Sequence, residues 1–501
     1  MAMYCTVVGR RVLTIEDLPD DALLAIFDFY VVIRYQDQDF RDFSEYNTKR
    51  KIESWQTLIH VCRRWRGLVF ESPRRLDLQL CCTTRTPARE TLDVWPALPL
   101  LIQGNVSETS LDNVITVLEH SDRICKINLD CHTMSRLKIE NLWTAMQVPF
   151  PELASLYLSF ENLSPYAGGP NSNSNFVLPD SFLGASAPRL RLLALVAVPF
   201  PGLPKLLLSA ATQLVNLYLH AIPHSGYISP EAMATCLSML ITLESLELEF
   251  ESPLSCPDQE NDRAPPTRSI LPALTFFSFK GVNEYLEDLV SRIDSPRLYQ
   301  LSTTFFHDID FNIPELNQFI TRTPSLGTCD EARLIFHSSE ALVSIRQSHI
   351  QAEQSDHRIV EVKILCQVSD WQLSSLAQIC TSSLHLFSTM ENLYIYEYLH
   401  SRSLWKDDIE NTEWLDLLFL FTAVKNLYIS KQFSPRIAPA LQELTGGRAT
   451  EVLPALQNVL LEGFQPSEPV QEGIAQFISA RQLTNHPVAI SVWDRFSLVQ
   501  D

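Results

Sequence analysis

Two residue pairs in the sequence have spacings that could support metal binding or nucleophilic catalysis. His220 and His224 are four residues apart, but Pro223 lies between them and argues against both imidazoles lying on one helix. Ser135 and Lys138 stand in an S-x-x-K arrangement, which is one element of a known serine-nucleophile pattern, but the companion motifs are missing. Neither pair therefore predicts a reaction.

The cysteines indicate core packing rather than metal binding or disulfide formation. Cys125, Cys131 and His132 lie close together in the sequence but lack the second ligand pair of a zinc site. The 11 cysteines are scattered without C-x-x-C pairs, and a buried thiol behaves as a small hydrophobic group. The sequence also has no G-x-S-x-G, Walker or H-E-x-x-H motif. We expect no enzyme activity, no cofactor and no metal site.

The composition is that of an ordered protein with an acidic net charge. Of 501 residues, 46% are apolar and 20% are charged. The formal net charge of -20 opposes binding to a phosphate backbone. The chain has no signal-peptide pattern at its start, and no run of about eighteen apolar residues that could span a bilayer. We expect no nucleic-acid or membrane partner, and a location in the cytoplasm, the nucleus or both.

Residues 13–75 are predicted to form a small helical module. Pro19 and two acidic residues, Asp20 and Asp21, precede apolar residues at helical spacing, which is typical of a helix start. A second apolar stripe recurs over residues 55–70, where Val61 and Trp65 share one helix face. A polar insert at about 33–54 separates the two helical stretches. Helices this short need each other or a partner to bury their apolar faces.

The module resembles the F-box family, which has a Leu-Pro pair, an acidic first turn, an Ile-Phe pair, and Val-Cys-(Arg or Lys)-x-Trp in the last helix. We expect the residues that match this pattern, or lie on the same helix face as the matching residues, to contact an adaptor. They are Leu18, Pro19, Leu23, Ile26, Phe27, Val61, Cys62 and Trp65. The polar insert departs from the family pattern. About the first hundred residues resemble the expanded F-box families of mushroom-forming fungi, including Leu76-Asp77-Leu78 and Asp93-Val94-Trp95-Pro96-Ala97-Leu98-Pro99.

The resemblance implies two kinds of partner. In the F-box family these helices dock on the Skp adaptor of a cullin-RING ubiquitin ligase, and the rest of the chain recruits a substrate. The chain is then expected to be a substrate-recruiting adaptor, a monomer within a complex of Skp adaptor, cullin ligase core and an unknown protein substrate. Two alternatives stay open: some matching residues could form the module's own core, and the chain could be a ligase-independent scaffold.

A second pattern runs through the rest of the chain. An apolar residue, two spacers, an apolar residue, one spacer and a third apolar residue recur, as in Leu153-x-x-Leu156-x-Leu158. Further copies begin at Ile124, Leu190, Leu214, Leu243, Leu274, Leu298, Met390, Val424 and Leu456. The intervals are irregular but fit a leucine-rich repeat, which combines one short strand with a returning helix, better than an ankyrin or tetratricopeptide period.

The segments between the repeats carry helix signals. Ser229 and Pro230 look like an N-cap with proline at the first helical position, and other starts are expected near Asn283, Pro314, Ser369, Thr412 and Ser467. The predicted fold class is α/β, a leucine-rich-repeat solenoid with a parallel sheet and returning helices, preceded by the small all-α module. We predict a connector and N-terminal cap at 76–119, the solenoid at 120–481, and a C-terminal tail or cap at 482–501.

The residue between the second and third apolar positions should point away from the solenoid core, because side chains alternate along a strand. Four of these residues are tyrosines, and the predicted substrate-binding positions are Tyr157, Tyr218, Glu247, Tyr394 and Tyr428. Tyrosines can supply rigid contact area with polar tips to a protein partner. Tyrosine also favours half-buried strand positions for packing alone, and the acidic neighbours could be a plain solvated edge, so both interpretations stay open.

Three stretches interrupt the repeats. Residues 164–179 and 251–267 are rich in loop-forming residues and are predicted to be loops. Over 326–380 the repeat register is uncertain, although strands are expected at 332–336 and 360–365.

Overall fold

A computed structural model shows where these elements lie. It describes residues 15–32, 54–73, 75–76, 78–131, 134–160, 177–200, 206–207, 212–255, 268–306, 313–327, 329–347, 359–366, 369–382, 387–397, 411–444, 446–463 and 468–493. The predicted polar insert at 33–54 lies almost entirely outside these ranges, and His132 also lies outside them. Most residues of the predicted loops at 164–179 and 251–267 lie outside them as well.

The N-terminal module is helical, as predicted. It consists of the 3-10 turn η1 (Ile15–Asp17) and the helices α1 (Asp20–Val32), α3 (Ser54–Ile59) and α4 (Arg63–Glu71). Asp20 and Asp21 occupy the first turn of α1, where the helix dipole favours negative charge. The Sγ of Cys62 accepts a hydrogen bond from the backbone N–H of Trp65 at 3.5 Å, so Cys62 is the N-cap of α4.

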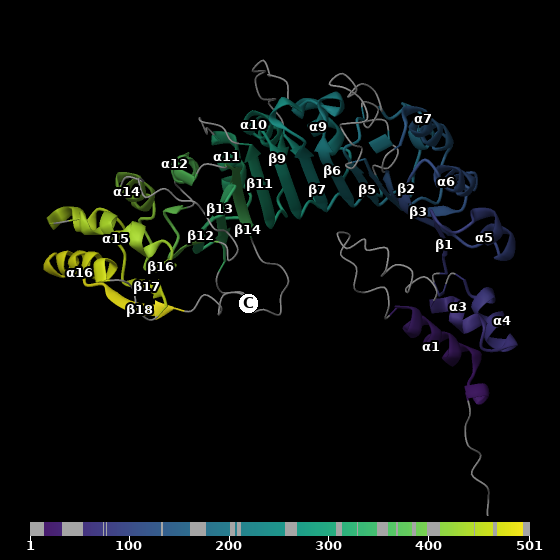
Figure 1. Cartoon of the computed structure of the whole chain (residues 1–501), viewed down its shortest axis with the longest axis horizontal. Helices are drawn as coiled ribbons and strands as arrows, with labels where there is room; N and C mark the ends of the chain where they lie inside the picture. Colours follow the sequence, from purple (N-terminus) through teal and green to yellow (C-terminus); the bar gives the residue numbers. More distant parts are fainter. Residues whose placement is uncertain are drawn as a thin grey trace, which may run out of the picture.

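Sixteen strands of the described chain form one sheet, which lines the inner side of an arch (Figure 1). Every neighbouring pair is parallel except the two that involve β13. In sheet order the strands are β1 (Leu80–Thr83), β2 (Leu100–Val106), β3 (Ile124–Cys131), β4 (Ser155–Ser159), β5 (Leu192–Val196), β6 (Asn216–Ile222), β7 (Ser245–Phe250), β9 (Phe276–Gly281), β11 (Gln300–Phe306), β14 (Ile359–Leu365), β13 (Glu340–Arg346), β12 (Glu331–Phe336), β15 (Asn392–Glu397), β16 (Asn426–Ile429), β17 (Asn458–Glu462) and β18 (Ala489–Trp493). A separate pair is formed by β8 (Ser269–Ile270) and β10 (Ile293–Asp294).

Helices cover the outer side of the arch (Figure 1). They are α5 (Ala88–Val94), α6 (Leu111–Leu118), α7 (Arg136–Ala145), α9 (Pro230–Leu237), α10 (Asn283–Ser291), α11 (Pro314–Arg322), α12 (Ser369–Ser382), α14 (Asn411–Phe419), α15 (Ser434–Gln442) and α16 (Glu468–Leu483), with 3-10 turns η3 (Phe182–Ala185), η4 (His224–Gly226), η5 (Pro253–Ser255) and η6 (Gly446–Thr450). The predicted helix starts are confirmed. At α9 the Ser229 Oγ accepts a hydrogen bond from the Ala232 N–H at 3.3 Å.

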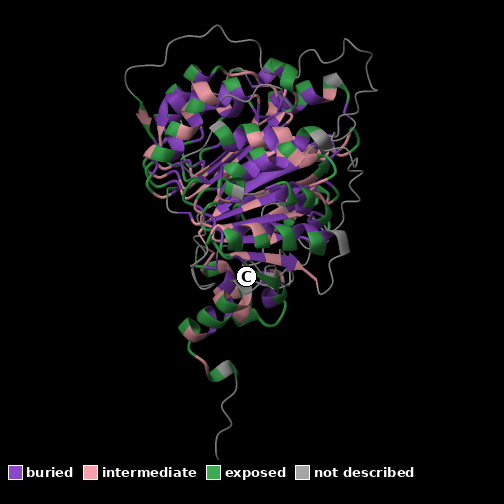
Figure 2. Cartoon of the chain, turned by 90° about the vertical axis from the view of Figure 1, so that its left-hand side faces the viewer, coloured by how far each residue is buried: buried purple, intermediate pink, exposed green. Residues whose placement is uncertain are grey.

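The repeat leucines align across the sheet. The middle apolar residues of the motifs are register partners on successive strands, in the order Leu156, Leu193, Leu217, Leu246, Phe277 and Leu301. All of them are fully buried beneath the helices, and Figure 2 shows that buried residues run along the strands. No single repeat can bury its apolar face, so neighbouring repeats complete one continuous core. The chain therefore folds as a leucine-rich-repeat solenoid, as the sequence predicts.

The sheet extends beyond the range predicted for the solenoid. Strands β1 and β2 lie in the segment 76–119, which we expected to be a connector and N-terminal cap, and β18 lies in the predicted C-terminal tail or cap at 482–501. Leu80, Leu100 and Ile102 are buried like the later repeat leucines. Their segments show alternating apolar residues without the full repeat motif, so the motif marks the sheet only from its third strand, β3, onward.

The region 326–380 contains a three-strand insertion. The two predicted strands are present as β12 and β14, but β13 lies between them and is antiparallel to both. Only three residues, 337–339, join β12 to β13, and so short a connection permits a hairpin but not a parallel crossover. The chain order is consequently reversed here: β11 pairs with β14, and β12 pairs with β15. No sequence pattern predicted β13.

Within the described residues, no helix combines the length and apolar character needed to cross a membrane. The longest helices, α16 and α12, cover the outer side of the arch (Figure 1).

Candidate functional site

Helix α1 has two apolar faces. Leu23 and Phe27 lie on the first face and are fully buried. The second face carries Ala25, Ile26 and Phe29, and its two large side chains are 46% and 69% exposed, respectively. A helix that is apolar on both sides normally has both sides covered, so the second face is a candidate docking surface.

The predicted adaptor-contact residues divide between the surface and the core of the module. Pro19, Ile26, Val61 and Cys62 are exposed, and Val61 is 57% exposed in the turn between α3 and α4. Leu23 and Phe27 are buried, Leu18 and Trp65 are half-buried, and the Phe27 and Trp65 rings lie 4.7 Å apart. The alternative that some motif residues form the module's own core therefore applies to Leu23 and Phe27.

An arginine fixes the first helix against the last. The guanidinium of Arg64 on α4 donates to the Leu18 carbonyl at 2.6 Å and through Nε to the Asp20 carboxylate at 3.1 Å. These bonds join the Leu-Pro segment to α4 and orient the exposed face of α1.

Trp55 attaches the module to the first repeat. The side chain is almost fully buried, its Nε1 donates to the Gln79 carbonyl at 3.2 Å, and its ring packs edge-on against Phe70 and Trp95. Phe70 belongs to α4, whereas Gln79 and Trp95 belong to the first repeat. Trp55 thus attaches the module to the N-terminal end of the solenoid.

The inner face of the sheet carries an aligned row of side chains, which we call the inner-face row. Its members alternate with the buried leucines and therefore point away from the helices. In sheet order they are Asn128, Tyr157, Ala194, Tyr218, Glu247, Ser278, Ser302, Glu361, Ser344, Arg333, Tyr394, Tyr428, Leu460 and Ser491. All five predicted substrate-binding residues lie in this row.

The first half of the row has accessible tyrosines. Tyr157 and Tyr218 are half-buried and flank the small Ala194 on the strand between them. The Tyr218 hydroxyl donates to the Asn216 Oδ1 at 3.3 Å. Ala194 is itself only 4% exposed, so this stretch offers a partner the partly accessible edges of the two tyrosine rings.

The second half of the row packs against itself. The Tyr394 and Tyr428 rings are stacked with centroids 4.0 Å apart, and Trp493 packs edge-on against both. Tyr394 is only 7% exposed, and burial raises the pKa of its hydroxyl above the ordinary value. The packing interpretation therefore holds for Tyr394, whereas Tyr428 keeps a partly accessible edge. Trp493 was missed because it follows the predicted solenoid.

Charged residues of the insertion join this aromatic cluster. The guanidinium of Arg333 lies 5.5 Å from the centroid of the Tyr394 ring and pairs with the Glu331 carboxylate through Nε at 2.5 Å. Burial lowers the pKa of Arg333, but the Glu331 carboxylate outweighs this effect together with its other partners, so the pKa lies above the ordinary value. The contact between Arg333 and Tyr394 could not be predicted from the local sequence, because β12 pairs with β15 only as a result of the reversed strand order in the insertion.

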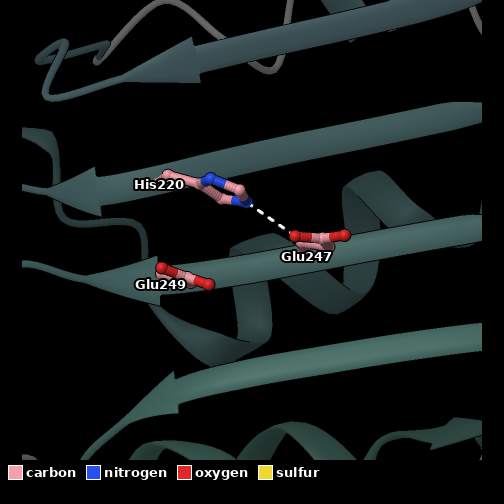
Figure 3. Close-up of side chains that lie close together, drawn as sticks. All are labelled: His220, Glu247 and Glu249. Atoms are coloured by element: carbon pink, nitrogen blue, oxygen red, sulfur yellow. Dashed lines mark hydrogen bonds and ion pairs between the residues drawn. The ribbon is translucent and has the colours of Figure 1, made fainter. Parts of the chain in front are cut away.

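A cluster of titratable groups lies in the middle of the inner face. Figure 3 shows His220 of β6 pointing toward Glu247 of β7, with Glu249 of the same strand nearby. The His220 Nε2 lies 2.8 Å from a Glu247 carboxylate oxygen, and one ligand atom from each of the three residues falls within 4.8 Å of the others. His224 lies apart on η4 and is exposed, so the two histidines do not share a helix, as the sequence indicated.

The other residues with potential chemistry have structural contacts. Cys131 is buried, and burial raises its pKa far above the ordinary value, while the Cys125 Sγ donates to the Leu100 carbonyl at 3.2 Å. The Lys138 Nζ lies 3.2 Å from the Asp112 carboxylate, which joins α7 to α6. A raised pKa makes a thiol a poor nucleophile, so Cys131 is a core residue.

Comparisons with known proteins give little beyond the architecture. No protein-family model matches the sequence, and no curated protein is similar to it. One similar solved structure is the leucine-rich repeat-containing protein LegL7 from Legionella pneumophila. It is 10% identical to this chain, the match covers 80% of this chain and 96% of that one, and the TM-score is 0.25. Such a likeness carries no functional argument, and the fold assignment rests on the sheet register.

Proposed function

We propose that the chain is a protein-binding adaptor: its N-terminal helices dock on the Skp adaptor of a cullin-RING ubiquitin ligase, and its solenoid holds a protein substrate. The observation that supports docking most directly is the second apolar face of α1, formed by Ala25, Ile26 and Phe29. This face includes one of the F-box-like motif residues, Ile26. The exposed motif residues Pro19 and Val61 supply further apolar surface.

The inner-face row is the proposed substrate surface. Tyr157, Tyr218 and Tyr428 offer aromatic contact area, whereas Glu247, also predicted as a contact residue, is only 8% exposed and pairs with His220. Aromatic residues carry much of the affinity of protein interfaces because they bury large rigid surfaces at a low entropic cost. Tyr394 contributes by holding Tyr428 in place rather than by direct contact.

The proposed mechanism is proximity. A chain that holds a substrate near a charged ubiquitin-conjugating enzyme raises the effective concentration of the reacting groups and supplies none itself. In this proposal the protein is not an enzyme, uses no cofactor and works as one copy within the ligase complex in the cytoplasm or nucleus. Nucleic acid and membrane are not partners.

A binding assay with the purified Skp adaptor tests the proposal. Ile26→Ser and Phe29→Ser together remove the second apolar face of α1 and leave the buried Leu23 and Phe27 in place. Phe419→Ser is the matched control, because Phe419 is 55% exposed on α14 of the solenoid. We expect wild type and control to bind stoichiometrically and the double variant to bind at least tenfold more weakly, with all three equally helical by circular dichroism.

A ligase-independent scaffold is the alternative function. The contacts of Trp55 favour it, since they attach the module to the end of the solenoid. If folded wild type does not bind the Skp adaptor at micromolar concentrations, the ligase role is wrong and the module acts as a cap of a repeat scaffold.

A further inference from the structure

We propose that His220, Glu247 and Glu249 form a binding site for a divalent transition-metal cation on the inner face of the sheet. The three side chains come from two neighbouring strands and point toward a common space (Figure 3). The inference does not depend on the proposed ligase role.

The strand geometry explains why these three residues meet. Glu247 and Glu249 are two residues apart on β7, so both point to the inner face. The register between β6 and β7 shifts after Leu219, and Ala221 adopts a left-handed φ of 47°. This irregularity follows His220 directly. Before it the register is regular: Tyr218 is the partner of Glu247, and His220 lies two residues further along β6 on the same face. The imidazole therefore lies diagonally beside Glu247, with its Nε2 2.8 Å from the carboxylate.

Electrostatics favour a cation between these groups. Glu247 is only 8% exposed, and a second carboxylate, that of Glu249, lies within 4.8 Å. Two carboxylates so close repel each other, most strongly where water is excluded. Lys280 on β9 is the register partner of Glu249 and supplies one positive charge, whereas a divalent cation would balance both carboxylates.

The ligand set selects the class of metal. One imidazole nitrogen and two carboxylate oxygens suit Zn²⁺, Mn²⁺ or Fe²⁺ rather than Ca²⁺, which takes six or more oxygen ligands. Metal–ligand bonds of about 2.0–2.2 Å place ligand atoms roughly 3–3.5 Å apart, so small side-chain rotations would close the present spacing. Three protein ligands leave positions open to water or to a donor from a bound protein.

Metal titration of the full chain tests this site. Zn²⁺ is titrated by calorimetry with a phosphine reductant, which keeps the cysteines reduced without chelating the metal. Mn²⁺ is titrated in parallel by electron paramagnetic resonance, because thiolates bind this harder ion poorly. Both titrations compare wild type with the variants His220→Gln and Glu249→Gln. His224→Gln is the matched control, since His224 is an exposed histidine outside the cluster.

We expect one equivalent of each metal to bind wild type and the His224→Gln control, and affinity to fall at least tenfold in His220→Gln and Glu249→Gln. Metal binding to wild type should also weaken, by about tenfold for each unit by which the pH falls in the range where the imidazole is protonated, because a histidine must be neutral to bind a metal. Absence of a Mn²⁺-binding equivalent in wild type, or equal affinity in His220→Gln, would overturn the proposal. Melting curves without metal verify that each variant is folded.

Discussion

Replacing Trp55 with alanine should uncouple the N-terminal helices from the first repeat. The indole is almost fully buried between Phe70 of α4 and Trp95 of the first repeat, and its Nε1 donates to the Gln79 carbonyl. The variant therefore tests whether the module is held in place by this contact.

The magnitude follows from the contacts that are lost. Truncating a buried tryptophan to alanine costs about 3–5 kcal/mol, including the cavity that it leaves. The Gln79 carbonyl also loses its donor, which costs about 1–3 kcal/mol when no water replaces it. These terms overlap, so we expect the opening free energy of the module to fall by about 4 kcal/mol. Trp55→Phe keeps most of the ring and should cost about 1–2 kcal/mol.

Hydrogen–deuterium exchange measures the local opening that this reasoning predicts. Protection of α1, α3 and α4 should fall strongly in Trp55→Ala, whereas protection of the central strands β5 to β9 should not change. Trp371→Ala is the control, because Trp371 is 50% exposed on α12. Unchanged exchange in α1 and α4 of the Trp55→Ala variant would refute the reasoning.

Two further predictions concern groups that join neighbouring repeats. Burial raises the pKa of Glu287 on α10 to about 7, against the lowering effect of the backbone N–H groups of Glu315 and Leu316 that donate to it. The folded protein then holds this proton more tightly than the unfolded chain, so the stabilisation is largest below about pH 4.5 and declines as the pH rises to about 7. Glu287→Gln should remove this dependence: between pH 5 and pH 7.5 wild type should lose roughly 1–2 kcal/mol relative to the variant in urea unfolding, and parallel pH profiles would contradict the prediction. Arg481 on α16 is fully buried and donates to four backbone carbonyls over 449–456, so Arg481→Met should cost about 2–4 kcal/mol in the same assay. An equally stable Arg481→Met variant would mean that the desolvation of the guanidinium offsets these hydrogen bonds.

Local patterns in the sequence predicted most of the solenoid. The motif at Leu153-x-x-Leu156-x-Leu158 defines a strand because its spacing alternates between the two faces, and β4 occupies that position. The helix start at Ser229-Pro230 could also be predicted from the sequence, since an N-cap and a first-turn proline act within one turn of helix. Such signals need no knowledge of the rest of the molecule.

The pairing of β13 is a feature that local sequence signals could not predict. Residues 340–346 form a regular strand, but the antiparallel pairing with β12 and β14 depends on which strands lie beside it. Pairing across a sheet is decided by long-range register rather than by strand propensity. The same holds for Trp493, which packs on Tyr394 and Tyr428 from strands distant in sequence.

Periodicity within a few residues was enough to predict the repeat architecture, the helical module and the identity of the inner-face tyrosines. Which of these residues are accessible depends on the tertiary structure. It buries Leu23, Phe27 and Tyr394, exposes Ile26, and brings His220 to Glu247 on the neighbouring strand. Side-chain exposure and contacts between strands depend on what packs against each face, and no local pattern specifies that neighbour.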